Sequence, residues 1–119
     1  RTSVLLILCA LSGLAQSAQS YIEGVRVLGI RQYTGGQFGN CIAEVNVNIN
    51  TAGTAQLACE KPFLVSMGCD GSKFAKSEGA AFLNTAQLAL VASRPMVMIV
   101  SDVDPYGGTT CTAVQMTVR

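Results

Sequence analysis

Four polar side chains at alternate positions are the best candidates for binding chemistry in this sequence. Residues 41–50 alternate between apolar and polar positions, and the polar set consists of Glu44, Asn46, Asn48 and Asn50. An asparagine carboxamide both donates and accepts hydrogen bonds, so a row of them suits the paired hydroxyls of a sugar. The same spacing suits a mineral surface or a neighbouring subunit, and it is also typical of a solvated strand face. We predict that these four residues form a ligand-binding set.

The cysteines are the second set with a defined chemistry. Of the five, Cys9 lies in an apolar N-terminal segment, and the others are Cys41, Cys59, Cys69 and Cys111. Four cysteines in a secreted domain predict two disulfides, with three connectivities open. We favour Cys41–Cys59, which would join the second and third strands, and Cys69–Cys111, which would join the turn before the helix to the last strand. No Cys-x-x-Cys motif occurs, so we predict no metal site.

Catalytic chemistry has few candidates here. The sequence contains no His, the commonest general base, and no Gly-x-Ser-x-Gly nucleophile motif. Asp102 and Asp104 lie beside Pro105 and a pair of glycines, and acidic residues in such a setting are more often turn formers than calcium ligands. The formal net charge of +1 also argues against a nucleic-acid partner. We therefore expect no catalytic residue, no cofactor and no enzymatic activity.

The N-terminal segment has the pattern of a secretion signal. Residues 4–14 form an almost unbroken apolar run, followed by small residues. A membrane-spanning helix needs about 20 apolar residues, so the run predicts a signal peptide and no membrane span. We expect residues 1–17 to be the signal, cut after Ser17 or after Ser20. Residues 18–119 would then be a single disulfide-stabilised domain, secreted to the extracellular space.

The rest of the chain is typical of short strands separated by turns. We expect strands at residues 21–33, 41–50, 55–59, 96–100 and 111–119, with a short piece at 63–67 that continues the third strand or stands alone. Gly24 and Gly29 are the expected bend or bulge sites of the first strand. A loop is expected over residues 102–108, because Asp, Pro and Gly are concentrated there.

One helix interrupts the strands. Residues 78–93 are rich in Ala and Leu, and the apolar positions that share a helical face are Phe82, Ala86, Ala89 and Leu90. Ser77 is the expected N-cap, and Pro95 ends the helix. The order is therefore β-β-β-α-β-β, a mainly β fold with one helix. It predicts an OB-like five-stranded barrel, with an α+β sheet covered by one helix as the alternative.

Part of this pattern resembles a known family. Residues 83–100, with the flanking strands, resemble the binding subunits of subtilase-cytotoxin-like bacterial toxins and their secreted relatives. In that family a cysteine opens the second strand, an Ala-Cys pair closes the third, and a helix with small residues precedes an apolar strand. The resemblance spans residues 41–118, and the matching positions are Cys41, Ala58, Cys59, Ala86, Ala89, Met96, Val97, Ile99 and Val100.

The resemblance implies an OB barrel, a pentameric ring and recognition of cell-surface glycans without catalysis. The chain departs from the family in two places. Residues 102–106 replace an aromatic-rich loop, and the segment between Cys59 and the helix is longer and contains the extra Cys69. No sugar-contacting residue is therefore carried over from the family to this chain.

Three functions fit these observations. The first is a secreted, non-catalytic module that binds a glycan or an extracellular surface, as a homo-oligomer if the resemblance holds. The second is a structural protein of an extracellular matrix, such as a shell, cuticle or coat. The third is a secreted inhibitor or effector that presents the loop at residues 102–110 to a partner protein.

Overall fold

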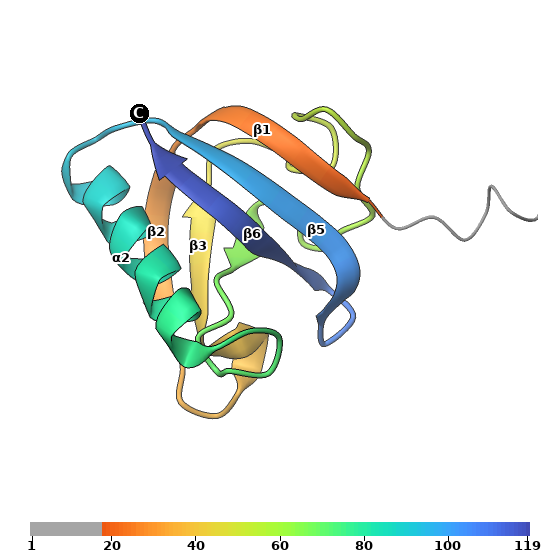
Figure 1. The fold of residues 1–119 in the computed structure, drawn as a ribbon. Helices are drawn as coiled ribbons and strands as arrows, with labels where there is room; N and C mark the ends of the chain where they lie inside the picture. The colour runs from red at the N-terminus through yellow and green to blue at the C-terminus, as the bar shows by residue number, and fades with distance from the viewer. Residues whose placement is uncertain (1–17) are drawn as a thin grey trace, which may run out of the picture.

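The computed structural model describes residues 18–119, which form mainly β structure with one α-helix. The predicted signal peptide, residues 1–17, lies outside the described residues. Along the chain the elements are β1 (Gln19–Val25), β2 (Val27–Gln32), the 3₁₀ turn η1 (Gln37–Asn40), β3 (Cys41–Val45), β4 (Leu64–Ser66), α2 (Lys76–Val91), β5 (Met96–Tyr106) and β6 (Thr110–Val118). The prediction of a mainly β fold with one helix before the last two strands is confirmed, but four strands precede the helix where three were predicted (Figure 1).

The six strands form one mixed sheet in the order β1-β5-β6-β4-β3-β2. The strands β4 and β6 pair in parallel, and the other neighbours are antiparallel. The two edge strands, β1 and β2, are separated in the chain only by Arg26, so the sheet curls until its edges meet at that residue. The prediction of a closed five-stranded barrel is wrong in this respect, because the described residues form six strands and β1 is not paired with β2.

The bulge sites explain why the first predicted strand is divided. The register of β1 on β5 shifts between Ile22 and Val25, and that of β2 on β3 shifts between Val27 and Gly29. These shifts contain the two predicted bend sites. Gly24 has a φ of 68°, a left-handed conformation that favours glycine. The bulge lets one continuous segment pair with β5 before Arg26 and with β3 after it.

Residues 46–63 form a long loop, where the sequence predicted the end of one strand and a further strand over 55–59. Strand β3 ends at Val45, and β4 has only three residues. The loop crosses the outer side of β1, where the N–H of Thr54 donates to the carbonyl of Tyr21 at 3.1 Å. The N–H of Tyr21 in turn donates to Oγ1 of Thr54 at 3.0 Å. These bonds satisfy part of an edge that would otherwise be open to another strand.

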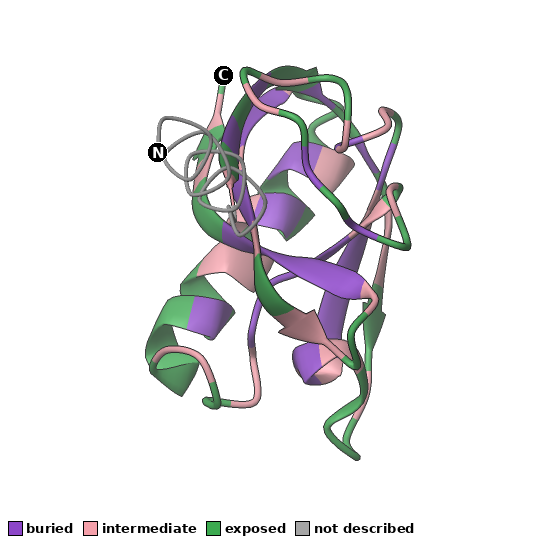
Figure 2. Cartoon of the chain, turned by 90° about the vertical axis from the view of Figure 1, so that its right-hand side faces the viewer, coloured by how far each residue is buried: buried purple, intermediate pink, exposed green. Residues whose placement is uncertain are grey.

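The helix α2 confirms the predicted helix with a shift of two residues at each end. Its buried residues are Gly79, Ala86 and Ala89, and this stripe faces the sheet (Figure 2). The predicted cap at Ser77 is wrong, because the helix begins after the extended residue Ala75 and no side chain caps it. A Cβ on Gly79 would lie 2.5 Å from the carbonyl oxygen of Gly68. The main chain at Gly68 therefore packs directly against the first turn of α2 and holds it in position without a side-chain cap.

The predicted loop over residues 102–108 is also wrong. Strand β5 continues to Tyr106, and a short turn joins it to β6 as a hairpin. The register shifts between Ser101 and Tyr106, and Asp104 within this bulge has a φ of 49°. The bulge therefore absorbs the turn-forming residues without ending the strand.

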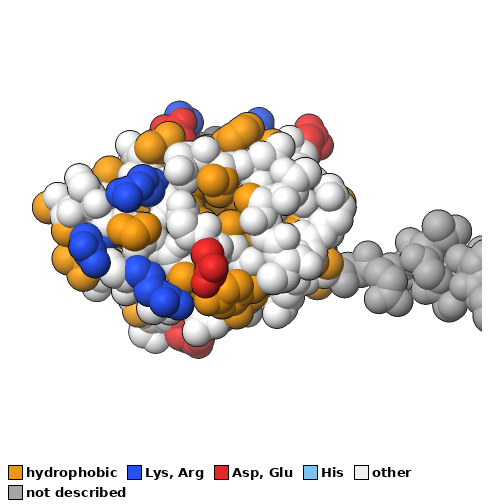
Figure 3. Space-filling model, turned by 90° about the horizontal axis from the view of Figure 1, so that it is seen from above, with side chains coloured by type: hydrophobic (Ala, Val, Ile, Leu, Met, Phe, Trp, Pro, Cys, Tyr) orange, Lys and Arg blue, Asp and Glu red, His pale blue; other side chains and the backbone are white. Residues whose placement is uncertain are grey.

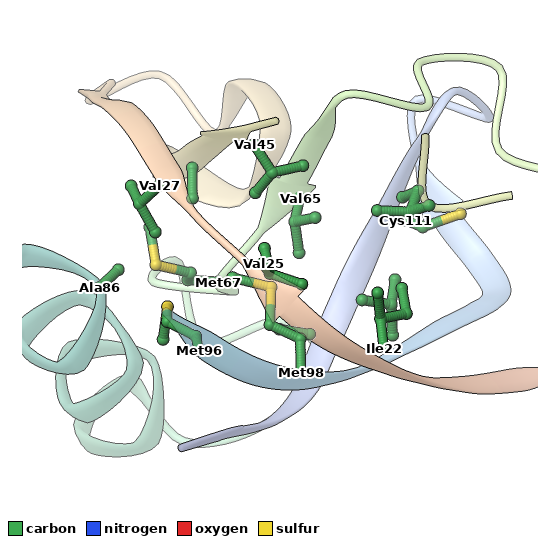
Figure 4. Packing of buried hydrophobic residues seen from close by; sticks show 14 of the residues in the cluster. Ile22, Val25, Val27, Val45, Val65, Met67, Ala86, Met96, Met98 and Cys111 are labelled. Carbon is green, nitrogen blue, oxygen red and sulfur yellow. The ribbon is translucent and has the colours of Figure 1, made fainter. Parts of the chain in front are cut away.

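A continuous apolar core fills the space between the curled sheet and the helix (Figure 4). Its largest fully buried side chains are Ile22, Ile49, Met67, Met96 and Met98. Both β1 and the irregular loop contribute to this set, so the loop is part of the core and not an appendage. Within residues 18–119 no helix has the length and apolar character needed to cross a membrane.

Candidate functional site

The predicted pairing of the cysteines is wrong, although the structure forms two disulfides. The bonds join Cys41 to Cys69 and Cys59 to Cys111, with Cα–Cα distances of 5.7 and 5.8 Å. The favoured pairs assumed that the segment ending at Cys59 was the partner strand of Cys41. That partner is β4 instead, and the N–H of Met67 donates to the carbonyl of Cys41 at 3.1 Å, which brings Cys69 alongside.

The structure does not arrange the predicted ligand-binding residues on one strand face. Only Glu44 lies in β3, and its carboxylate is 3.9 Å from the guanidinium of Arg31 on β2. Beyond the end of β3, the loop contains the other three, namely Asn46, Asn48 and Asn50. The premise of a flat polar row is therefore wrong.

The three asparagines use their side chains to shape the loop. Oδ1 of Asn46 accepts the N–H of Arg26 at 2.8 Å, and Oδ1 of Asn48 accepts the N–H of Asn50 at 3.0 Å. The carboxamide of Asn50 exchanges two hydrogen bonds with the main chain of Cys59, both 2.9 Å long. Such side chains compete with a strand ladder for main-chain partners, which explains why β3 ends early. Ligand binding by this set stays a prediction.

An open cleft of about 500 Å³ lies at another place, between the loop of residues 33–40 and the turn of the β5–β6 hairpin. Aromatic rings and small polar groups line it together. The lining residues are Tyr33, Gly36, Gln37, Phe38, Tyr106, Gly107 and Thr109. The cleft has the mixture of apolar surface and a few polar groups that is typical of small-molecule sites.

Hydrogen bonds within the loop hold its side of the cleft. The N–H of Tyr33 donates to the carbonyl of Asn40 at 2.7 Å, and Oδ1 of Asn40 accepts the N–H of Gly36, also at 2.7 Å. The rings of Tyr33 and Phe38 are 5.5 Å apart between centroids and are tilted by 59°. This separation is within the range of favourable aromatic pairs, so the two rings support each other.

The loop reaches the ring of Tyr106 through Gly39. A Cβ at this position would lie 2.6 Å from Cζ of Tyr106 and 2.8 Å from Oγ of Ser66. Only glycine permits so close an approach, and its φ of 72° also favours glycine. Oγ of Ser66 donates to the carbonyl of Phe38 at 2.7 Å, which fixes the loop to β4.

A third segment, residues 70–73, directly follows Cys69 and contacts the side chain of Tyr106. The Tyr106 hydroxyl donates to Oδ1 of Asp70 at 3.0 Å, and the same oxygen accepts the hydroxyl of Ser72 at 2.8 Å. The ammonium of Lys73 lies 4.8 Å from the centroid of the Tyr106 ring and 3.5 Å from the carboxylate of Asp104. Cation–π attraction and these hydrogen bonds hold the ring in a fixed orientation at the cleft wall.

The pKa values of the two partners move in opposite directions. Burial acts to raise the pKa of the Asp70 carboxyl, but hydrogen bonds from Ser72, from Tyr106 and from its own main chain outweigh it and lower the pKa below 3.8. Burial raises the pKa of Tyr106 above 10.0, and the neighbouring Asp70 raises it further, while the Ser72 hydroxyl opposes the shift. The phenol therefore stays protonated and keeps donating to the carboxylate across the neutral range.

This arrangement predicts a stability difference that depends on pH. The pKa of Asp70 is lower in the folded state than in the unfolded state, so its negative charge stabilises the folded state. This contribution is fully present at pH values above the unfolded pKa of about 3.9, and it is lost as the pH falls through the folded pKa. Since solvent screens the partly exposed group, we expect Asp70→Asn to cost roughly 0.5 kcal/mol at pH 7. Urea unfolding of both proteins at pH 7 and pH 2 measures this. A difference that persists at pH 2 would contradict the charge-based explanation.

A second cluster consists of arginines near the end of α2. Nη1 of Arg26 donates to the carbonyl of Ser93 at 3.0 Å, and Nε of Arg94 donates to the carbonyl of Arg119 at 2.6 Å. Basic side chains with apolar ones between them gather on part of the face seen in Figure 3. Arg26 therefore bonds to the chain just beyond the C-terminus of α2, and Arg94 bonds to the residue that follows β6, so both guanidinium groups have a structural role.

Sequence reasoning missed the residues of the cleft. The signal was present, because Tyr33, Phe38 and Tyr106 make up three of the seven aromatic residues and each lies within two residues of a glycine in the sequence. Glycines have no side chain that could cover a neighbouring ring, and all three rings are only half-buried. That combination points to a binding surface more directly than the alternating asparagines do.

Comparisons of this chain with protein-family models, with curated proteins and with solved structures find no match.

Proposed function

We propose that this protein is a secreted, non-catalytic module that binds carbohydrate in the cleft between residues 33–40 and the β5–β6 turn. The observation that carries the proposal is the composition of the lining, in which three aromatic rings stand beside an amide and a hydroxyl: Tyr33, Phe38, Tyr106, Gln37 and Thr109. Ring faces offer apolar contact to the C–H face of a pyranose, and the amide and hydroxyl can pair with its hydroxyl groups.

The position of the cleft in the strand order supports the same proposal. If β1 and β2 are counted as one bent strand, this first strand pairs with β5 at one end and with β3 at the other. The sheet then has five strands, and the helix follows the third of them, β4. This is the connectivity that we propose as OB-like, in keeping with the resemblance to toxin binding subunits. OB folds bind oligosaccharides and oligonucleotides through the loop between strands 1 and 2 and the loop between strands 4 and 5. In this chain those loops are residues 33–40 and the β5–β6 turn.

Charge favours a sugar over a nucleic acid. None of the residues that line the cleft is cationic, and Lys73 lies at the ring of Tyr106 and pairs with Asp104. Nucleic-acid affinity depends largely on Lys and Arg contacts to phosphates. A neutral lining with aromatic faces therefore suits an uncharged glycan better.

A second cleft suggests that the ligand has more than one sugar ring. It has a volume of about 520 Å³ and shares Tyr33 with the first cleft. Its other lining residues include Gln32, Thr34, Asn40 and Lys76. A linear oligosaccharide could contact both sides of the Tyr33 side chain.

The two disulfides support the secreted part of the proposal, because such bonds persist mainly in oxidising compartments.

The test is a glycan array with the disulfide-intact domain, followed by calorimetric titration of the best ligand. We expect Tyr33→Ala and Tyr106→Ala each to weaken binding about tenfold, because a stacked ring contributes roughly 1.4 kcal/mol. Tyr106→Phe keeps the ring and should retain most of the affinity. Tyr21→Ala, which removes a tyrosine on β1 outside the cleft lining, is the matched control.

Two results would contradict the proposal. The first is an array on which no glycan binds, and the second is glycan binding that neither cleft substitution weakens. If the cleft substitutions instead abolished capture of a protein partner, the inhibitor or effector function would replace the carbohydrate-binding one.

A further inference from the structure

Asp102 holds the first described residue of the chain. Its Oδ1 accepts the main-chain N–H of Ala18 at 2.7 Å, and its own N–H donates to the carbonyl of Ala18 at 3.1 Å. The second carboxylate oxygen, Oδ2, accepts the N–H of Ala58 at 3.1 Å. Asp102 thus ties the start of β1 and the long loop to β5, and it is not the turn former that the sequence predicted.

The carboxylate of Asp102 accepts hydrogen bonds from main-chain N–H groups, and no Lys or Arg among residues 18–119 forms an ion pair with it. Within residues 18–119, the two ion pairs join Arg31 to Glu44 and Lys73 to Asp104. A carboxylate that accepts from a charged nitrogen gains a Coulomb attraction that a neutral N–H does not supply. The nitrogen closest to Asp102, that of Ala18, would carry a charge if the chain began there.

We propose that the Ser17–Ala18 peptide bond is the processing site and that the α-ammonium group released on Ala18 forms an ion pair with Asp102. Water cleaves the bond in a signal-peptidase reaction, leaving a carboxylate on Ser17 and a protonated amine on Ala18. Ala15 and Ser17 supply the small residues that such an enzyme requires before the cut. The proposal is independent of carbohydrate binding.

The other predicted cut, after Ser20, conflicts with the packing of β1. Ser20 is fully buried and pairs with Val100 in the β1–β5 ladder. Its Oγ accepts the N–H of Ala55 at 3.3 Å, so it also anchors the long loop. A cut after Ser20 would remove two ladder positions and place a charged amine on Tyr21, next to the core.

The processing site can be read directly from secreted protein. Residues 1–119, preceded by an initiator Met, are expressed in a secretory host, and the intact mass and N-terminal sequence of the secreted product are determined. We expect a product that begins at Ala18. A product that begins at Tyr21 or elsewhere, or that retains residues 1–17, would overturn the proposal.

The ion pair is tested with protein of residues 18–119, compared with a free and with an acetylated α-amine. Acetylation keeps an N–H at Ala18 but removes the charge. We expect the free-amine form to have a folding equilibrium constant three- to tenfold larger. Asp102→Asn should abolish that difference, whereas the control Glu60→Gln, which removes an exposed carboxylate, should preserve it. Equal constants for the two forms of the unsubstituted protein would refute the ion pair.

Discussion

The double substitution Cys59→Ala/Cys111→Ala should lower the free energy of unfolding by about 4 kcal/mol. The bond spans 52 residues, so its loss frees a large part of the unfolded chain from a constraint. It joins the irregular loop to β6, and both cysteines are buried. Because whole domains are stable by only about 5–15 kcal/mol, we expect partial unfolding near physiological temperature. Urea unfolding followed by circular dichroism measures the loss.

The same variant tests the disulfide pairing. In protein of residues 18–119, which lacks Cys9, the variant retains only Cys41 and Cys69, and with these two bonded to each other thiol titration under denaturing conditions should detect no free thiol. Two free thiols would contradict the pairing. The comparison variant Cys41→Ala/Cys69→Ala should be destabilised by about 3.5 kcal/mol, since its bond spans 28 residues. It should also weaken sugar binding, because Cys69 precedes the segment that supports Tyr106.

Ile22→Ala should destabilise the fold by about 2–5 kcal/mol, the usual cost of emptying a fully buried site. Ile22 is 0% exposed and lies in the core on the same side as Cys111 (Figure 4). Leu28→Ala is the matched control on the other half of the same segment. Leu28 is 59% exposed, and we expect its loss to change stability by about 0.5 kcal/mol or less. Equilibrium unfolding of the three proteins under one set of conditions is the measurement.

This pair of variants examines the bulge at Gly24. In an uninterrupted strand, Ile22 and Leu28 would lie on the same face, because side chains alternate with a period of two. The register shift between Ile22 and Val25 reverses the alternation and turns Leu28 outward. Comparable losses from the two substitutions would mean that the strand continues without the bulge.

Segments governed by local pattern could be predicted well. The helix and β6 occur within two residues of where the sequence places them, and β5 begins where it was predicted but extends six residues further, to Tyr106. One repeated spacing determines which side of such a segment is buried. The apolar run of residues 96–100 is almost wholly buried, as expected. Gly24 and Gly29 coincide with real irregularities because glycine weakens a strand wherever it occurs.

The long loop shows where such reasoning fails. Residues 46–50 have a strand-like alternation, yet Asn46 and Asn50 bond to Arg26 and Cys59, which are distant or irregular parts of the chain. Alternating asparagines look the same in the sequence whether their side chains face solvent or bond to main-chain groups that would otherwise pair with a neighbouring strand. The pairing of the cysteines depended on the same assumption and was wrong for the same reason.

Composition and short-range spacing are enough to predict the mainly β class with one helix, the apolar core and the oxidised cysteines. Which cysteines pair and where the cleft lies depend on contacts between distant parts of the chain. The cleft requires Gly39, Asp70 and Tyr106 to meet, and these residues lie up to 67 positions apart in the chain. Their meeting depends on the curl of the sheet and on the Cys41–Cys69 bond, and no local period in the sequence encodes a contact between such distant segments.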